Sequence, residues 1–269
     1  MAIYHFSAQI INRRGKKGNQ RSVVDCAAYR SGQKLFDERY QKVRFYKKEV
    51  VPVTKILVPD NAPEWAKDRE KLWNEVEKIE ERVDAQLARE FNVALPKELI
   101  NEEQDKLTFE FCQKTFVDDG MVADIFIHRE DSNNPYFQVM LTTRPFNSDG
   151  TWGLKVAKVD DMEKHKFTKK YVYTTNWNDR NTLRKWRKQW EVMTNDYLKK
   201  NGIDERISCE SNKTLKKETA ATVHEGHGRR LSNKGKKSDR VKLNETIKDY
   251  NETVNELNQL KQKKQKKKQ

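Results

Sequence analysis

Apolar residues recur with two different periods along most of the chain. Where they recur at every second position we expect β-strands, and where they recur every three or four positions we expect amphipathic helices. The expected strands are residues 3–11, 55–58, 91–95, 121–128 and 137–143. The expected helices are residues 22–32, 63–82, 101–117 and 180–201.

Residues that start and stop secondary structure support these elements. Ser22 stands at a helix N-cap position and Gly32 at a helix end. A polar segment rich in turn-forming residues, 129–135, joins the last two strands. Strands that return through tight turns pair antiparallel, so the pattern favours an antiparallel or mixed sheet over a doubly wound parallel one.

The composition is that of a basic, folded protein. The 269 residues carry a formal charge of +14, and 35% of them are hydrophobic and 10% aromatic. The chain has no apolar run long enough for a membrane span, and its N-terminus lacks a secretory signal pattern. Three widely spaced cysteines form no disulfide framework. We therefore expect a cytoplasmic protein with a polyanionic partner.

The positive charge is concentrated at the C-terminal end. Residues 229–269 contain 14 Lys and Arg against 5 Asp and Glu. Within this tail, one apolar stripe at helical spacing predicts a helix, and it consists of Leu243, Ile247, Tyr250, Val254 and Leu257. We expect the lysine run at 263–268 to be solvated and disordered. We divide the chain into a domain of residues 1–228 and a basic, helical or disordered tail of residues 229–269.

Tyr29 is the first candidate for chemistry. It lies in the expected helix 22–32 among small residues and near basic ones. A helical tyrosine is commonly a packing residue with a solvated hydroxyl. Small neighbours would also let a phosphodiester approach that hydroxyl, and a tyrosine can attack phosphorus if the phosphoryl charge is neutralised.

The second candidate is a group on two adjacent strands. His128 ends one strand, and Tyr136 and Gln138 share a face at the start of the next one. Such geometry can gather three side chains around one metal ion. A lone histidine with a glutamine is a poor cation site, however, so spacing alone favours a structural role for these residues.

Four stretches and two residue pairs together resemble the MobA/MobL family of plasmid mobilisation relaxases, which are HUH-type tyrosine DNA-nicking enzymes. The resemblance runs from Met1 to about Gly226. It implies an α+β fold, in which helices flank an antiparallel-dominated central sheet that grips single-stranded DNA. The matching stretches are residues 21–32, 88–96, 120–128 and 134–141, and the pairs Trp177-Asn178 and Trp186-Arg187.

The resemblance also implies a reaction and a site. The family tyrosine falls on Tyr29, which would attack one phosphodiester at a plasmid origin of transfer and become linked to the 5′ phosphate. The first of three metal-binding histidines falls on His128, so a divalent ion, Mg²⁺ or Mn²⁺, is implied as cofactor. Glu90 matches a family carboxylate near the site, and a catalytic role and a plain ion pair remain equally open for it.

This sequence departs from the family at the other two metal positions. The family has His-x-His there, whereas this chain has Tyr136 and Gln138. A phenol is a poor ligand near neutral pH, and an amide oxygen suits hard ions better than transition metals. Three interpretations stay open: a nickase with a rebuilt metal site, a catalytically impaired relaxase-fold protein that binds single-stranded DNA, or an artificially disabled enzyme.

Basic residues near Tyr29 are the expected DNA contacts. Clusters of Lys and Arg with nearby aromatic residues suit phosphate binding with base stacking. The implied partners are single-stranded plasmid DNA at the origin of transfer and accessory relaxosome proteins. The expected DNA-binding residues are Arg21, Arg30, Lys34, Arg44 and Lys47.

Overall fold

The computed structural model divides the chain into two compact units, Met1–Ile207 and Ser208–Gln269. The division after residue 228 that the sequence indicates stays a prediction. The structure describes residues 4–15, 20–160, 169–211, 214, 218–220, 222–223 and 239–266. Each unit is described by itself.

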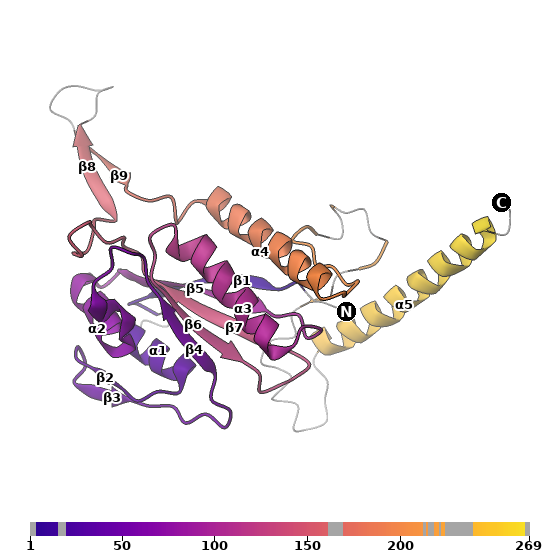
Figure 1. Cartoon of the computed structure of the whole chain (residues 1–269), viewed down its shortest axis with the longest axis horizontal. Coiled ribbons are helices and arrows are strands. Elements are labelled where there is room, and N and C mark those ends of the chain that lie inside the picture. The colour runs from indigo at the N-terminus through magenta and orange to yellow at the C-terminus, as the bar shows by residue number, and fades with distance from the viewer. Residues whose placement is uncertain are drawn as a thin grey trace. The chain divides into compact units, whose positions relative to one another are not determined.

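A five-stranded sheet forms the centre of the first unit (Figure 1). Its strand order is β1-β5-β7-β6-β4, and every neighbouring pair is antiparallel. The expected single sheet and the α+β class are therefore confirmed. The strands are β1 (Phe6–Asn12), β4 (Val53–Leu57), β5 (Gln86–Ala94), β6 (Ala123–His128) and β7 (Tyr136–Leu141).

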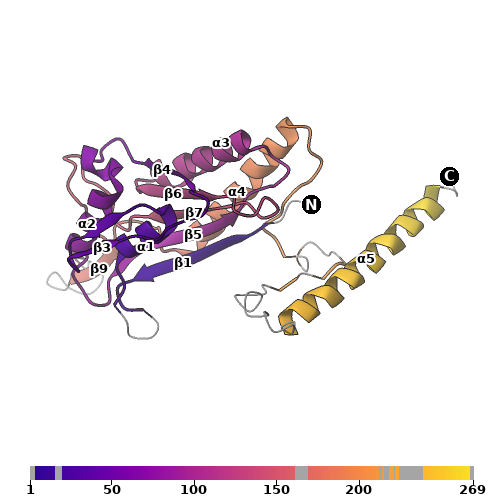
Figure 2. The same ribbon diagram turned by 90° about the horizontal axis from the view of Figure 1, so that it is seen from below.

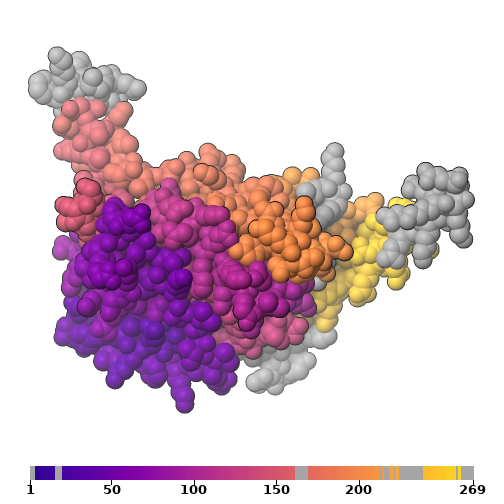
Figure 3. Space-filling model, viewed as in Figure 1, coloured from indigo at the N-terminus to yellow at the C-terminus, as the bar shows by residue number. Residues whose placement is uncertain are grey.

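Two helices cover one face of this sheet. They are α3 (Asn101–Cys112), which continues into a π-helical turn at Gln113–Val117, and α4 (Arg180–Lys200). Alternate strand residues such as Phe91 and Phe137 pack against Trp190 of α4 and against α3. The tryptophans of this layer are buried, as expected of core residues. Side chains of α3 and α4 cover much of this face in the space-filling view (Figure 3).

The other face carries α1 (Val23–Ser31) and α2 (Arg69–Ile79), so the unit has three layers (Figure 2). The opposite set of strand residues, including Phe126 and Met140, packs here with Val24 of α1 and Trp73 of α2. Because side chains alternate along a strand, the even-numbered residues of β6 and β7 all point toward this layer. His128, Tyr136 and Gln138 belong to that set.

The prediction of one helix over residues 63–82 is wrong in its extent. A 3₁₀ turn at Glu64–Lys67 is followed by a break at Asp68, and α2 begins at Arg69. Asp68 is extended, with φ −94° and ψ 119°, and its side chain accepts a hydrogen bond from the Lys71 amide. An aspartate that caps a new helix N-terminus competes with continuing the preceding turn.

Two hairpins were not expected from the sequence. They are β2–β3 (Leu35–Asp37 and Lys42–Arg44) and β8–β9 (Val156–Asp160 and Lys169–Tyr173). The strands of β8–β9 are largely exposed on both sides, so no buried face imposes an alternating pattern on their sequence. This second hairpin stands clear of the three layers (Figure 1).

The second unit contains α5 (Asp239–Lys266). The expected helix is confirmed, but it reaches Lys266, so the prediction of disorder is wrong for residues 263–266, and residues 267–269 lie outside those described. Asn251 and Asn244 each pair with both peptide groups of one residue in the segment before the helix, Ala220 and Val223 respectively, at 2.7–2.9 Å. Across the described parts of both units, no helix is long and apolar enough to span a bilayer.

Candidate active site

Helix α1 has clear ends and a fixed position. Ser22 accepts a hydrogen bond from the Asp25 amide at 3.2 Å, and Gly32 ends the helix with φ +69°, which confirms both expected caps. The first helical amide, of Val23, donates to a carboxylate oxygen of Glu77 in α2 at 2.7 Å. The N-terminus of α1 is thus held by a buried acidic group, which also suits the helix dipole.

The C-terminal end of α1 is held by a buried ion pair to the sheet. Arg30 donates from Nε and Nη2 to the two carboxylate oxygens of Glu90 in β5, at 2.6 and 2.7 Å. Burial lowers the pKa of Arg30, but its hydrogen bonds and the charge of Glu90 outweigh this, so the pKa is raised. Arg30 is 9% exposed, which leaves it little access to a DNA phosphate. Both carboxylate oxygens of Glu90 accept hydrogen bonds from Arg30, which favours a role for Glu90 in positioning α1.

Tyr29 faces away from this anchor. The next position on a helix points about 100° away, so Arg30 enters the core while Tyr29 reaches solvent and is 53% exposed. Its ring meets that of Tyr46 edge to face, with centroids 5.3 Å apart. Lys48 places its Nζ 4.3 Å from the centre of the Tyr29 ring. An exposed tyrosine side chain with an ammonium group over its ring is accessible to an anionic substrate.

The end of the sheet brings the expected metal-site residues together. His128 pairs directly with Tyr136 across β6 and β7, and their rings stack at 4.8 Å between centroids and an angle of 18°. Gln138 lies two residues along β7 and donates to Glu90 at 3.1 Å. The polar series Gln138–Glu90–Arg30 therefore connects this group to the helix that carries Tyr29.

His128 is buried and its environment favours the neutral ring. Burial is the largest influence and lowers the pKa of His128. The carboxylate of Glu130, which lies 3.2 Å from Nδ1, raises this pKa, and the positive charge of Lys48 lowers it further. The influence of Lys48 on both Tyr29 and His128 indicates that these two groups share one region. The Nε2 atom of His128 is buried, and the side chain of Gln138 interacts with the ring and, like Glu130, opposes the lowering of its pKa.

These residues do not fit a three-imidazole metal centre. Only one imidazole is present, and Glu90, the nearest carboxylate in β5, is taken by Arg30. Within the described ranges no group of three or more His, Cys, Asp or Glu side chains is placed to hold a metal ion. The donors that remain are the Nε2 atom of His128 and the oxygens of Tyr136 and Gln138, a set that suits a weakly held hard ion better than a transition metal.

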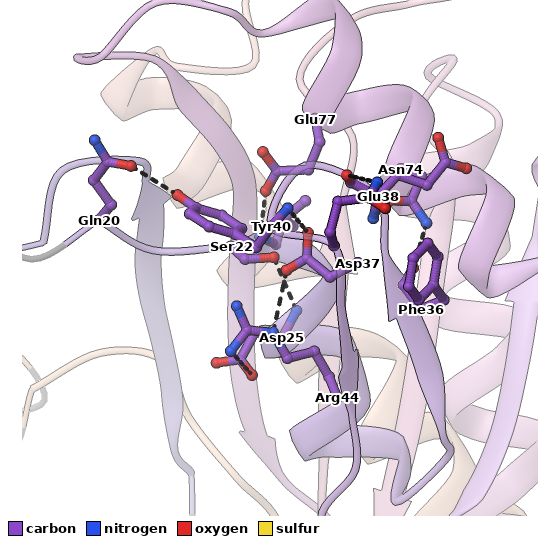
Figure 4. Close-up of polar contacts among 12 residues, drawn as sticks. Gln20, Ser22, Asp25, Phe36, Asp37, Glu38, Tyr40, Arg44, Asn74 and Glu77 are labelled. Atoms are coloured by element: carbon purple, nitrogen blue, oxygen red, sulfur yellow. Dashed lines mark hydrogen bonds and ion pairs between the residues drawn. The ribbon is translucent and has the colours of Figure 1, made fainter.

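The other expected DNA contacts lie around α1 and differ in whether their charge already has an acidic partner. Arg21, Lys34 and Lys47 are exposed. Arg44 is paired with Asp37 at 3.2 Å and Asp25 at 3.5 Å, so part of its charge is already balanced. Figure 4 shows Arg44 with Asp37 and Asp25. Tyr46, whose hydroxyl donates to Asp25, had no signal in the sequence beyond its proximity to basic residues.

An antiparallel sheet with a tyrosine helix over its polar end is the layout expected of a relaxase. A sequence model of the MobA/MobL family matches residues 21–237, and the chain belongs to this family.

Several known proteins are similar to the chain. It is 32% identical over 271 residues to the "Conjugal transfer protein TraA" of Agrobacterium fabrum (strain C58 / ATCC 33970), covering 93% of this chain and 24% of that protein. It is 28% identical over 252 residues to the "Mobilization protein MobL" of Acidithiobacillus ferridurans, covering 84% of this chain and 62% of that protein. The chain thus spans about a quarter of the TraA protein.

A solved structure shares the fold. A chain described under "Molecular Basis of Vancomycin Resistance Transfer in Staphylococcus aureus" superposes with a TM-score of 0.67 at 30% identity, covering 78% of this chain and all of that one.

Proposed function

We propose that this protein is a conjugative relaxase that nicks one strand of plasmid DNA at an origin of transfer. The observation that carries the proposal is the placement of Tyr29. Its side chain is 53% exposed on a helix fixed at both ends, with Lys48 over its ring and the His128 group connected to the same helix through Glu90.

In the proposed reaction the Tyr29 oxygen bonds to phosphorus and the bond from phosphorus to the 3′ oxygen breaks. The 5′ phosphate stays on the tyrosine, and the 3′ oxygen leaves and takes up a proton. The ammonium group of Lys48 stabilises negative charge that develops on the phosphoryl oxygens. A neutral His128 is the candidate acceptor for the tyrosine proton, because burial lowers the pKa of its ring.

Relaxases of this family generally use a divalent metal ion. For this chain we propose Mg²⁺ or Mn²⁺, because two of the three remaining donors are oxygen atoms. Such an ion would polarise the scissile phosphate when bound. The substrate we propose is single-stranded DNA of the origin of transfer, with accessory relaxosome proteins as further partners.

The second candidate function is single-stranded DNA binding without nicking. The replacement of two metal-binding histidine positions by Tyr136 and Gln138 favours it. The exposed side chain of Tyr29 favours the enzyme, because a protein that only binds DNA has no need of a nucleophile there.

The test is the formation of a covalent adduct. Labelled single-stranded oligonucleotides that tile the origin of transfer are mixed with the protein and Mg²⁺ or Mn²⁺, and a protein-bound 5′ label is measured. We expect the adduct with the natural sequence and with Tyr171→Phe, which changes an exposed tyrosine of β9, and none with Tyr29→Phe. An adduct that persists in Tyr29→Phe rules out the assigned nucleophile.

A further inference from the structure

A cavity of about 390 Å³ lies beside Tyr29, between α1 and the β2–β3 hairpin. The proposed reaction uses one residue of its lining, Tyr29. Its lining includes the side chains of Tyr29, Tyr40, Tyr46, Arg21, Cys26 and Arg44. Three aromatic rings and three arginines, of which Arg30 is already bound to Glu90, are an unusual concentration around one small cavity at the surface.

The polar ends of the aromatic walls are held in place. The Tyr46 hydroxyl donates to Asp25 at 2.8 Å, and the Tyr40 hydroxyl donates to Gln20 at 3.0 Å (Figure 4). Arg44 lies 5.6 Å from the centre of the Tyr40 ring. Because the hydroxyls are bound at the edges, the ring faces keep their orientation without a ligand.

The hairpin that supplies two of these rings is itself fixed to α2. Asn74 donates to the Phe36 carbonyl at 2.8 Å and accepts from the Glu38 amide at 2.9 Å, and Glu70 accepts from the Phe36 amide at 2.6 Å. Figure 4 shows these contacts on the far side of the hairpin from Asp25. The cavity is therefore preformed, and a ligand would bind with little loss of conformational entropy.

The chemistry of the lining favours a neutral, flat ligand over a phosphate. Burial raises the pKa of the Cys26 thiol, so this part of the wall carries no charge. Two arginines of the lining already have acidic partners, since Arg30 is bound to Glu90 and Arg44 to Asp37 and Asp25, so their charges are less available to a phosphate group. Arg21 is exposed at the same site and can contact the sugar–phosphate backbone from outside.

We propose that this cavity binds one unpaired nucleobase of the scissile strand, next to the phosphodiester that Tyr29 attacks. The inference rests on the proposed function, since the base is placed by its covalent connection to that phosphate. The volume lies at the lower end of the range of small-molecule sites and suits a single nucleotide. Stacking on tyrosine gives affinity for any base, and the amide of Gln20 at the edge gives a basis for preference.

The experiment combines an abasic scan of the DNA with a substitution in the cavity. Each nucleotide around the nick is replaced in turn by an abasic site, and binding of the single strand is measured for the unaltered protein and Tyr40→Ala. At one position adjacent to the mapped nick, we expect the abasic site to weaken binding by about 5- to 150-fold, the range for one stacked base. In Tyr40→Ala the same abasic site should have no further effect.

Two variants serve as controls. Phe45→Ala removes an aromatic residue that is 55% exposed, adjoins Tyr46 in sequence and is absent from the cavity lining, so the abasic effect should persist. Tyr40→Phe keeps the ring and should keep most of the effect even if the alanine variant is poorly folded.

Two outcomes overturn the inference. In the first, Tyr40→Ala and each abasic site weaken binding independently, so that their effects add at every position. In the second, the effects of the two changes overlap only at a nucleotide that is not adjacent to the nick. The failure of the proposed function is distinguished from these outcomes, because it appears as a missing Tyr29-dependent adduct with unaltered DNA. If the abasic site next to the nick weakens binding in the unaltered protein but not in Tyr40→Ala, the result supports base binding in this cavity.

Discussion

At the scale of single residues, the site depends on two consecutive side chains with opposite orientations. Arg30 binds the sheet through Glu90, and Tyr29 reaches outward. The position of the tyrosine is therefore set by β5 and not by the loops around it. Removing one partner of a buried ion pair typically costs about 3–5 kcal/mol, so changes at Arg30 should affect folding as well as activity.

Lys48 gives the first prediction. We expect Lys48→Ala to slow adduct formation by about a hundredfold or more, the usual effect of removing one group that stabilises a transition-state charge. Lys47→Ala is the matched control, because this neighbour is exposed and makes no contact with the Tyr29 ring in the described structure. Equal, small effects of both substitutions would assign Lys48 to general DNA binding.

The altered metal positions give the second prediction. Tyr136→His and Gln138→His together should raise affinity for Zn²⁺ or Mn²⁺ and increase nicking, while each change alone should do little, because ligands of one ion act as a unit. Calorimetric metal titration measures the affinity independently of the reaction. If the hydroxyl of Tyr136 itself takes part in the reaction, the double variant will not nick faster and Tyr136→Phe will lose the nicking activity.

The sequence predicted part of the site. Strand alternation was sufficient to place His128 opposite the start of the next strand and to put Tyr136 and Gln138 on one face. The pairing of Arg30 with Glu90 could not be predicted in this way, since the two residues are 60 positions apart and a basic residue near a tyrosine is equally typical of a DNA contact. Burial decides between those roles, and burial is a property of the packed layers.

At the scale of secondary structure, the end of α1 gives the third prediction. Gly32 and Gly202 both have φ +69°, but a Cβ atom at Gly32 would lie 2.8 Å from Cγ of Lys48, whereas one at Gly202 would have open space. Gly202→Ala should therefore cost about 1–2 kcal/mol of stability from backbone strain alone. Gly32→Ala should cost more and should also displace Lys48.

Thermal unfolding and adduct formation separate the two glycine variants. We expect slower adduct formation in Gly32→Ala and an unchanged rate in Gly202→Ala at a temperature where both are folded. A normal rate in Gly32→Ala would show that Lys48 can move without loss of activity.

The strands of the central sheet and most of the helices were predicted well, and the two hairpins were missed. The Ser22 and Gly32 caps and the strands of the central sheet follow from local signals and alternation. The start of β5 was missed because its first residues, Gln86 to Glu90, include polar residues that pair with α1 and the neighbouring loops. The β8–β9 hairpin is exposed on both sides, so nothing in its pattern distinguishes it from a loop.

At the scale of the whole molecule, the net charge of +14 gives the fourth prediction. Affinity for single-stranded DNA should fall steeply with salt, because each phosphate contact releases bound cations, with a slope of about −0.7 per contact. Tyr29→Phe should keep the slope of the unaltered protein. Lys47→Ala should reduce it by somewhat less than one unit if Lys47 contacts a phosphate. A complex insensitive to salt would contradict DNA binding through the basic surface.

The paired asparagines of α5 have a consequence for how its partner segment can evolve. Asn244 and Asn251 lie seven residues, or about 10 Å, apart along one face of the helix, and they accept hydrogen bonds from the N–H groups of Val223 and Ala220 respectively. These four hydrogen bonds join the side-chain amides to peptide groups, so they do not depend on which side chains stand at positions 220 and 223. Proline is the exception, because it has no N–H to donate. A library of substitutions at these two positions should thus tolerate nearly every residue, with proline alone releasing the segment.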